Sequence, residues 1–266
     1  MAQAPLWLIA IFLLAIWAGY FILTRQNFRQ AFEFILIGLS ATISTTLWSY
    51  SMALILGLIA GLGRISRNVI IKNLATLYVE IIRGIPILVL IFYIALVAVP
   101  SVVDSLQALG FWLISRDISF LGEPLSLLSN QAISMNTRAV IALSVTYGAF
   151  LAEIFRAGIQ SIGRGQMEAA RSLGMSYGEA MRYIILPQAI RNVLPALGND
   201  FVAMVKDSSL VSVLAVRDIT QVARLYAGRT FRFREAYTTL AVLYLTMTLV
   251  LSLIVRMIER RYERNG

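Results

Sequence analysis

Ionisable and polar side chains interrupt an otherwise apolar stretch at residues 188–213, and they are the first candidates for chemistry. Asn199 and Asp200 lie near the middle of this stretch. Burying such groups in lipid is costly unless they face a cavity or a partner. We therefore predict that they line a substrate pathway, where an ionised Asp200 attracts cationic groups and repels anionic ones. The same stretch adds further pathway candidates toward its end, at Lys206, Asp207 and Ser208.

Each of these candidates has a structural alternative. Asp200 could form an ion pair with Arg191 or Lys206 that only holds neighbouring helices together. Thr146 and Tyr147, in the preceding apolar stretch, are candidates for hydrogen bonds to a ligand. Hydroxyl groups at such positions equally suit the packing of one helix against another.

The composition excludes several kinds of catalysis. The chain has no cysteine and no histidine, so it offers no thiolate, no Ser–His pair and no histidine-ligated metal. No G-x-x-x-x-G-K-[ST] sequence occurs, so the chain carries no phosphate-binding loop of the Walker A type. We therefore predict that the chain is not an enzyme and binds no cofactor of its own.

The elements that position these residues are membrane-spanning helices. Of the 266 residues, 59% are hydrophobic and only 14% are charged, whereas a soluble domain is about 25% charged. A helical crossing needs about 20 apolar residues. Five stretches meet or approach that requirement, at residues 5–23, 34–63, 84–103, 139–152 (apolar on to 159) and 236–255. Residues 188–213 form a sixth crossing that a hydropathy plot could miss, because they carry charges, Pro195 and Gly198.

A polar segment at residues 161–187 separates two of these crossings. Residues 168–173 favour a helix, which Gly174 then ends. Ser176 and Glu179 have the spacing of a capping box, and Pro187 is expected to end the second helix. Glu168 with Arg171 and Glu179 with Arg182 are spaced for pairing along the helices. An ordinary solvated loop is the alternative; a DNA-binding helix-turn-helix is disfavoured by the small net charge and the flanking spans.

Lysine and arginine in short loops set the predicted orientation. Basic residues flank the loop near residue 66, the polar segment and the C-terminus, so these regions and the N-terminus are predicted to be cytoplasmic. Residues 104–137 then form an outer loop or amphipathic lid. The predicted outer side also carries five arginines, although basic residues are usually cytoplasmic. They either bind an acidic partner or are simply tolerated there. They are Arg217, Arg224, Arg229, Arg232 and Arg234.

Several sequence blocks lie in the polar segment and in the stretches around it. Glu168-Ala169-Ala170, followed by Gly174 and by ILP at 185–187, resembles the EAA loop of permease subunits of ABC importers. The other blocks are YVEIIRGIP at 78–86, AEIFRAGIQ at 152–160, LPQAI at 186–190, LGNDF at 197–201 and KDSSLVSV at 206–213. Together the blocks resemble the polar amino-acid uptake branch of these permeases, and the similarity extends over residues 34–261.

This resemblance implies the fold and the partners. The fold is an all-α integral membrane protein, a type I ABC importer-like helical bundle with a five-span core and one extra N-terminal span. Residues 1–27 are the extra helix, 28–261 the transmembrane domain and 262–266 a tail. The polar segment is a cytoplasmic coupling loop, in which the ATPase contacts are Glu168, Ala169, Ala170, Arg171 and Gly174.

The implied assembly contains two permeases, like or unlike, two ATPase subunits that bind ATP and Mg, and an external substrate-binding protein. The predicted function is a permease of an ATP-driven amino-acid importer in a bacterial inner membrane, in contact with lipid and without nucleic acid. Asp200 favours a cationic or neutral polar amino acid. The alternatives are a secondary transporter or channel without ATPase subunits, and a membrane scaffold. The extra span and the long outer loop are departures from minimal members of the branch.

Overall fold

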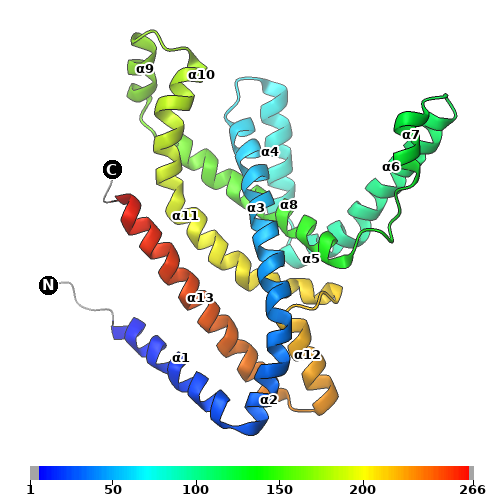
Figure 1. The fold of residues 1–266 in the computed structure, drawn as a ribbon. Helices are drawn as coiled ribbons and strands as arrows, with labels where there is room; N and C mark the ends of the chain where they lie inside the picture. Colours follow the sequence, from blue (N-terminus) through cyan, green and yellow to red (C-terminus); the bar gives the residue numbers. More distant parts are fainter. Residues whose placement is uncertain (1–5, 264–266) are drawn as a thin grey trace. The chain divides into compact units, whose positions relative to one another are not determined.

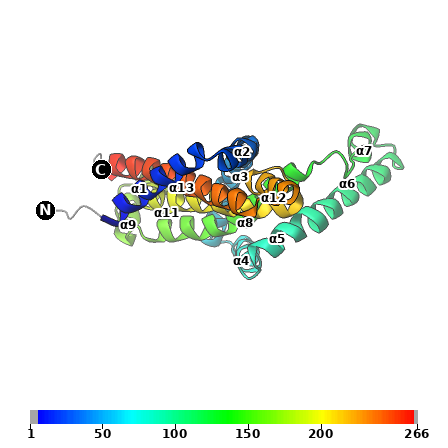
Figure 2. The ribbon, with the colours of Figure 1, turned by 90° about the horizontal axis from the view of Figure 1, so that it is seen from below.

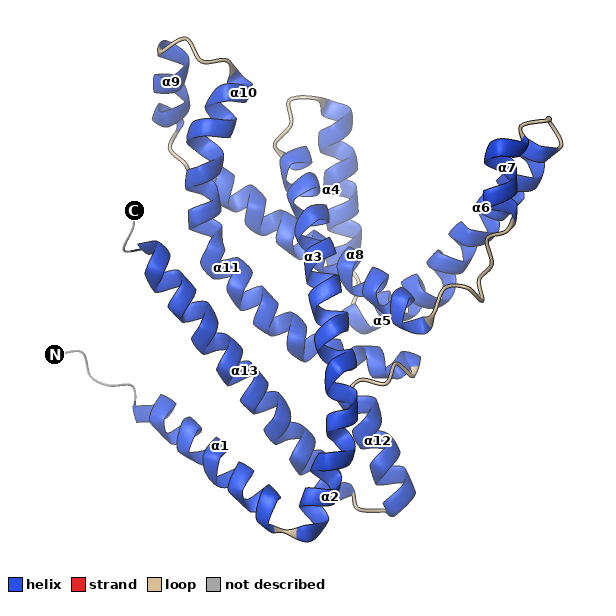
Figure 3. Cartoon of the chain, viewed as in Figure 1, coloured by secondary structure: helices blue, strands red, loops and turns tan. Residues whose placement is uncertain are grey.

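The structure is a computed structural model that describes residues 6–263, except for the side chains of residues 6–9, 164 and 260–263. Pro5, where the first span was predicted to begin, and residues 264–266 of the predicted tail lie outside this description. Every regular element among the described residues is a helix (Figures 1 and 3). The all-α prediction is thus confirmed for the described part of the chain.

The helices follow one another with short connections. The longer ones are α1 (Leu6–Thr24), α2 (Gln26–Ile35), α3 (Leu39–Arg64), α4 (Val69–Arg83), α6 (Val99–Ile114), α8 (Met135–Gln160), α11 (Leu186–Asp207), α12 (Ile219–Thr230) and α13 (Phe233–Glu263). The shorter ones are η1 (Leu36–Gly38), α5 (Ile87–Tyr93), η2 (Ile94–Ala98), α7 (Ser119–Ser126), α9 (Arg164–Ser172), α10 (Tyr177–Ala180), η3 (Met181–Ile185) and η4 (Ser208–Leu214).

Four helical segments of the described chain are long and apolar enough to cross a membrane. They are Gln26–Arg64, Ile87–Ile114, Met135–Gln160 and Phe233–Glu259. The apolar part of α1 that is described, Ala10–Thr24, is shorter. Helix α11 is long enough at 22 residues but is not apolar enough to join this group, and the sequence had predicted that a hydropathy plot could miss the sixth crossing.

The chain forms two compact units. The first comprises Met1–Ser44 and Leu194–Gly266, and the second comprises Thr45–Val193. In the first unit, α2, α12 and α13 surround an apolar core that contains Ile35, Ile219 and Ala236, each fully buried. Helix α1 packs against α2 and α13 (Figures 1 and 2).

The second unit is organised around α8, whose side chains are mostly buried. Glycines let α3 approach it closely, because a Cβ on Gly57 would lie 2.6 Å from Leu151 Cβ. The Ser144 hydroxyl donates to the Ser49 carbonyl across the same contact. On the other side of α8, the Tyr78 hydroxyl of α4 donates to the Val145 carbonyl at 2.6 Å.

One local expectation was wrong. Pro187 does not end a helix, because the chain is helical without a break from Tyr177 to Asp207. The wider turn of η3 ends two positions before Pro187, and this change in hydrogen-bonding pattern accommodates a residue that lacks an amide hydrogen.

The stretch 104–137 is also more regular than a loop. Helix α6 continues the span of α5 and η2, and α7 folds back against it. Close approach is possible because Gly110 lies against the backbone of Ser126, and Gly122 against Ile114. The result is a helical hairpin.

Candidate functional site

Helix α9 of the polar segment ends in the way that the sequence predicted. Gly174 adopts a left-handed conformation with φ of 84°. The Met175 amide donates to the Ala170 carbonyl at 3.2 Å, and the Gly174 amide donates to the Arg171 carbonyl at 3.0 Å. These two bonds form a Schellman motif, which satisfies the last carbonyls of the helix.

The next helix begins with the predicted capping box. The Ser176 hydroxyl accepts from the Glu179 amide at 3.2 Å, while the Glu179 carboxylate accepts from the Ser176 amide at 2.7 Å. The bond from the Ser176 backbone, followed by that from its side chain, lowers the pKa of Glu179 below its usual value. Both helix ends around the turn are therefore fixed by local hydrogen bonds.

The polar segment is anchored on one side to the helices that flank it. Ala170 is 4% exposed, and Met167 packs against a core cluster formed by Ile159, Ile185 and Ala189. The Arg67 guanidinium, in the connection between α3 and α4, lies 5.2 Å from the centre of the Tyr177 ring. The ends of α3, α8 and α11 are thereby joined to this segment.

The opposite side of α9 is exposed. Glu168, Ala169 and Arg171 are all exposed, and Leu173 is exposed over 84% of its surface. The predicted pair of Glu168 with Arg171 is not formed, because Arg171 donates instead to the Met175 carbonyl at 3.1 Å. Nor does Glu179 pair with Arg182, since its carboxylate caps Ser176. This side therefore presents apolar and charged groups together.

The second unit contains an ion cluster, which the sequence analysis did not predict. Arg64 of α3 contacts Glu153 of α8 at 2.6 Å and Glu80 of α4 at 3.3 Å. Glu153 also pairs with Arg156, and Arg83 approaches it at 3.9 Å. The cluster joins three helices through side chains that lie far apart in the chain. The sequence did contain one indication of these ion pairs. Glu80 and Arg83 are three residues apart, and so are Glu153 and Arg156.

The pathway candidates of α11 and η4 lie in the first unit. Asn199 is exposed and Asp200 is half-buried, next to Gly198, which packs closely against Val255 of α13. Among the described residues Asp200 forms no ion pair, so the alternative pairing with Lys206 is not seen. Of the remaining candidates, Lys206 is exposed, Asp207 is half-buried and Ser208 is buried.

Thr146 and Tyr147 lie in the second unit, inside α8. Both are buried, and the Thr146 hydroxyl finds no hydrogen-bond partner among the described residues. The Tyr147 ring meets the Phe150 ring edge to face at 6.0 Å between centres. Because the pathway candidates divide between the two units, their joint role in one pathway stays a prediction.

Comparison with known proteins agrees with this architecture. Residues 53–264 match the family described as binding-protein-dependent transport system inner membrane component. The chain belongs to this family. The resemblance to ABC importer permeases is thereby confirmed, and so is the prediction that the chain is a membrane subunit rather than the ATPase.

Similar proteins cover nearly the same length. The glutamine transport system permease protein GlnP of Escherichia coli (strain K12) is 33% identical over 233 residues, covering 88% of this chain and 94% of that protein. The arginine transport system permease protein ArtQ of Bacillus subtilis (strain 168) is 32% identical over 232 residues, covering 87% and 94%.

Solved structures support the fold. A crystal structure of an amino acid ABC transporter with histidines has a TM-score of 0.69 and 37% identity, covering 86% of this chain and 94% of that chain. An inward-facing MetNI methionine ABC transporter has a TM-score of 0.64 at 18% identity, covering 86% and 96%, and this likeness concerns the fold alone. The predicted type I importer-like bundle is confirmed.

Proposed function

We propose that this chain is a translocation subunit of an ATP-driven amino-acid importer, coupled through α9 to a separate ATPase subunit. The observation that carries this proposal is the two-sided construction of α9. One side is anchored through Ala170 and Met167 to the ends of membrane helices, while the other presents Glu168, Ala169 and Arg171 to a partner.

Such a construction suits the transmission of force. A docking element that moved freely would absorb a partner's motion, whereas α9 is held by a Schellman motif, a capping box and an apolar cluster. The small side chain of Ala169 allows a partner to approach closely, and Glu168 offers a charge to a basic residue. Motion of the ATPase would then pass to α8 and α11.

The ion cluster extends this connection. Glu153 and Arg156 lie on α8 shortly before the polar segment, and Glu153 joins that helix to Arg64 near the end of α3. Helices that are tied together in this way would move as a group when α9 is displaced. In this proposal the cluster is a structural link and not part of the substrate pathway.

The proposed assembly follows from the family. It contains a second permease, like or unlike this one, two ATPase subunits that bind ATP and Mg, and an external substrate-binding protein. The chain lies in a bacterial inner membrane with both termini cytoplasmic. Residues 1–27 act as an extra N-terminal helix, 28–261 as the transmembrane domain and 262–266 as a tail.

The proposed substrate is a cationic or neutral polar amino acid. Asp200 is half-buried and has no ion-pair partner among the described residues, so its carboxylate can meet a positively charged group. The substrates named for the relatives, glutamine for GlnP and arginine for ArtQ, are of this class. In the proposal Asn199, Thr146, Tyr147, Lys206, Asp207 and Ser208 supply further polar contacts.

The experiment is uptake in proteoliposomes that contain this chain, its ATPase and its binding protein. Arginine, glutamine and glutamate compete in the presence and absence of ATP. ATP-dependent uptake of arginine or glutamine supports the proposal, and loss of the preference over glutamate in Asp200→Asn places this carboxylate in the pathway. Uptake without ATP would indicate a secondary transporter or channel, while an absence of all uptake would indicate a scaffold. A preference for glutamate would remove Asp200 from the pathway.

A further inference from the structure

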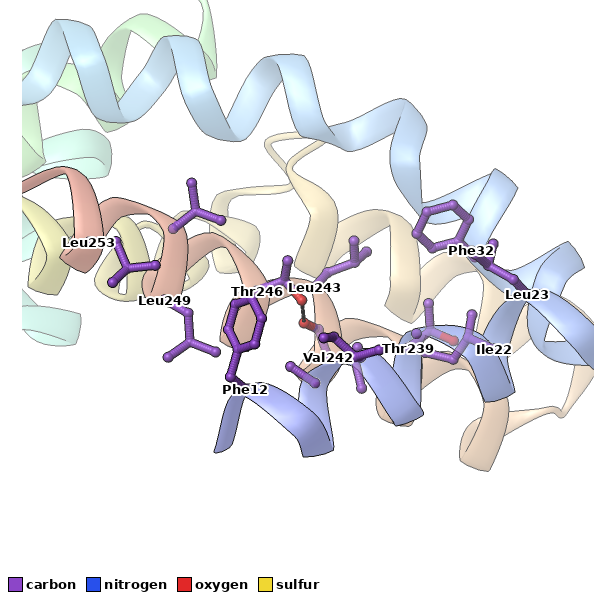
Figure 4. A pocket seen from close by; sticks show the side chains of 14 residues that line it. Phe12, Ile22, Leu23, Phe32, Thr239, Val242, Leu243, Thr246, Leu249 and Leu253 are labelled. Carbon is purple, nitrogen blue, oxygen red and sulfur yellow. Dashed lines mark hydrogen bonds between the residues drawn. The ribbon is translucent and has the colours of Figure 1, made fainter. Parts of the chain in front are cut away.

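The first unit contains an apolar, partly open cavity between α1 and α13. Its volume is about 470 Å³, and it is lined by these two helices and by Phe32 of α2 (Figure 4). Figure 4 shows Phe12, Leu249 and Leu253 toward one end and Ile22, Leu23 and Phe32 toward the other. The cavity therefore follows the length of the two helices and is not a pit at one point.

The lining of this cavity is almost entirely hydrocarbon. The hydroxyl of Thr246 is occupied, because it donates to the Val242 carbonyl at 2.8 Å. Thr239 brings the other hydroxyl and is fully buried. Gly19 contributes to the width, since a Cβ built on it would meet nothing within 4 Å. A site of this chemistry, beside a membrane-spanning helix, suits a flexible hydrocarbon chain.

Cations gather where α1 ends and α13 begins. The Arg25 guanidinium lies 5.6 Å from the centre of the Phe21 ring, and the Arg234 guanidinium lies 5.9 Å from that of Phe28. The two rings contact each other edge to face, with centres 5.1 Å apart. The two exposed guanidinium groups are therefore held on one pair of aromatic rings, one turn from Ile22 of the cavity wall.

Arg25 and Arg234 are available to bind an anion, because the nearby polar side chains are bonded to other arginines. Arg29 is paired with Glu33 at 2.9 Å, and Arg232 donates to the Gln30 side chain at 2.8 Å. Among the residues that the structure describes, neither Arg25 nor Arg234 has an acidic side chain within ion-pair distance. Because a cation beside a hydrocarbon groove complements an anion carrying a hydrocarbon tail, the charge distribution selects one class of occupant.

We propose that this groove binds an anionic phospholipid. One acyl chain lies between α1 and α13, and the phosphate lies beside Arg25 and Arg234 at the membrane surface. A transmembrane helix of a second copy fits less well, because a helix is about 10 Å across with its side chains. The lipid ties α1 to the rest of the first unit. This inference depends on the membrane location and not on the transported substrate.

The test uses photoreactive lipids with the full transporter complex. Phosphatidylglycerol and phosphatidylethanolamine carry the same acyl chain with a diazirine group, and mass spectrometry locates the labelled residues. Wild-type protein should be labelled on α1 and α13, more strongly by phosphatidylglycerol. The double variant Arg25→Gln/Arg234→Gln should lose labelling by phosphatidylglycerol several-fold, because the attraction to the lipid's negative charge is lost, and labelling by phosphatidylethanolamine should stay unchanged.

A second variant tests the cavity itself. Gly19→Leu should lower labelling by both lipids, because its side chain fills space that is open in the wild type. The matched controls are Arg256→Gln near the other end of α13 and Ala10→Leu on an exposed part of α1, and both should be labelled like the wild type. Equal labelling by the two lipids, labelling that neither test variant changes, or cross-links to a second copy at this groove would overturn the proposal.

Discussion

Within residues 45–193, two polar regions use their charges in opposite ways. In the ion cluster, Arg64 and Glu153 satisfy each other at 2.6 Å, and the Arg64 side chain is only 13% exposed. In α9, Glu168 and Arg171 are exposed and do not pair with each other. Charges that hold helices together are enclosed with their partners, whereas the charges that we propose to contact another subunit are accessible.

The two regions also differ in how they are built. In the polar segment, the end of α9 and the start of α10 are fixed by hydrogen bonds between residues three to five positions apart. The ion cluster depends on contacts such as the one between Arg64 and Glu153, which are 89 positions apart. Substitutions should therefore distinguish the two regions. Changes on α9 should lower ATP-driven uptake, and changes in the ion cluster should lower stability.

The largest effect is expected from Ala169→Arg. This bulky cation on the exposed side of α9 would prevent close approach of the ATPase, so ATP-driven uptake should fall by about ten-fold or more, the size of effect seen at the centre of an interface. The thermal unfolding midpoint should stay unchanged, because no internal contact is lost. Gln166→Arg, exposed at the start of the same helix, is the matched control and should retain most uptake.

Glu153→Gln should have the next largest effect, on stability. The variant leaves Arg64 and Arg156 without their shared carboxylate, and loss of a charged hydrogen bond costs about 2 kcal/mol. The unfolding midpoint of the purified complex should fall by about 5 °C. Glu80→Gln is the control, since the Glu80 side chain is 62% exposed and its pair with Arg64 contributes about 0.5 kcal/mol or less. Equal losses in the two variants would contradict the view that the cluster is centred on Glu153.

Gly174→Ala should have a smaller effect, on the stability of the turn that follows α9. A residue with a Cβ costs about 1 kcal/mol in a left-handed conformation, and Gly174 has φ of 84°. The α9 end should loosen, which hydrogen exchange of residues 170–176 would detect as faster exchange. Gly178→Ala is the control, because Gly178 lies in α10 and a Cβ at this position would meet nothing within 4 Å. Unchanged exchange in Gly174→Ala would argue against a fixed turn.

The smallest effect is a pH dependence at Glu179. Hydrogen bonds from Ser176 lower the pKa of Glu179, so their stabilisation is present above the unfolded value of about 4.3 and is lost as the pH falls through the lower folded value. The difference in unfolding midpoint between wild type and Glu179→Gln should be small at pH 7. It should disappear at pH values below the folded pKa. A difference that grows on acidification would contradict this sign.

The same contrast explains what could be predicted from the sequence. The turn at Gly174 and the capping box at Ser176 were predictable, because each depends on a few adjacent residues. The interruption at Pro187 was predicted wrongly, because the wider turn at 181–185 accommodates it. The hairpin of α6 and α7 was missed, since it depends on Gly110 and Gly122 meeting across the chain.

The pathway and the ion cluster show the limit of that approach. Periodicity places Glu80 and Glu153 on their helices, but it does not say which helices lie together, so the cluster became visible only in three dimensions. Asp200 was identified because a carboxylate in an apolar stretch is unusual.

The most direct test of the coupling proposal uses the absence of natural cysteine in this chain. Ala169→Cys on exposed α9 is labelled with a maleimide benzophenone in the assembled transporter and irradiated. We predict a covalent adduct with the ATPase subunit, while Ala170→Cys, at a position only 4% exposed in the wild type, gives none. If a transporter that remains active in ATP-driven uptake forms no adduct from position 169, α9 is not the coupling element.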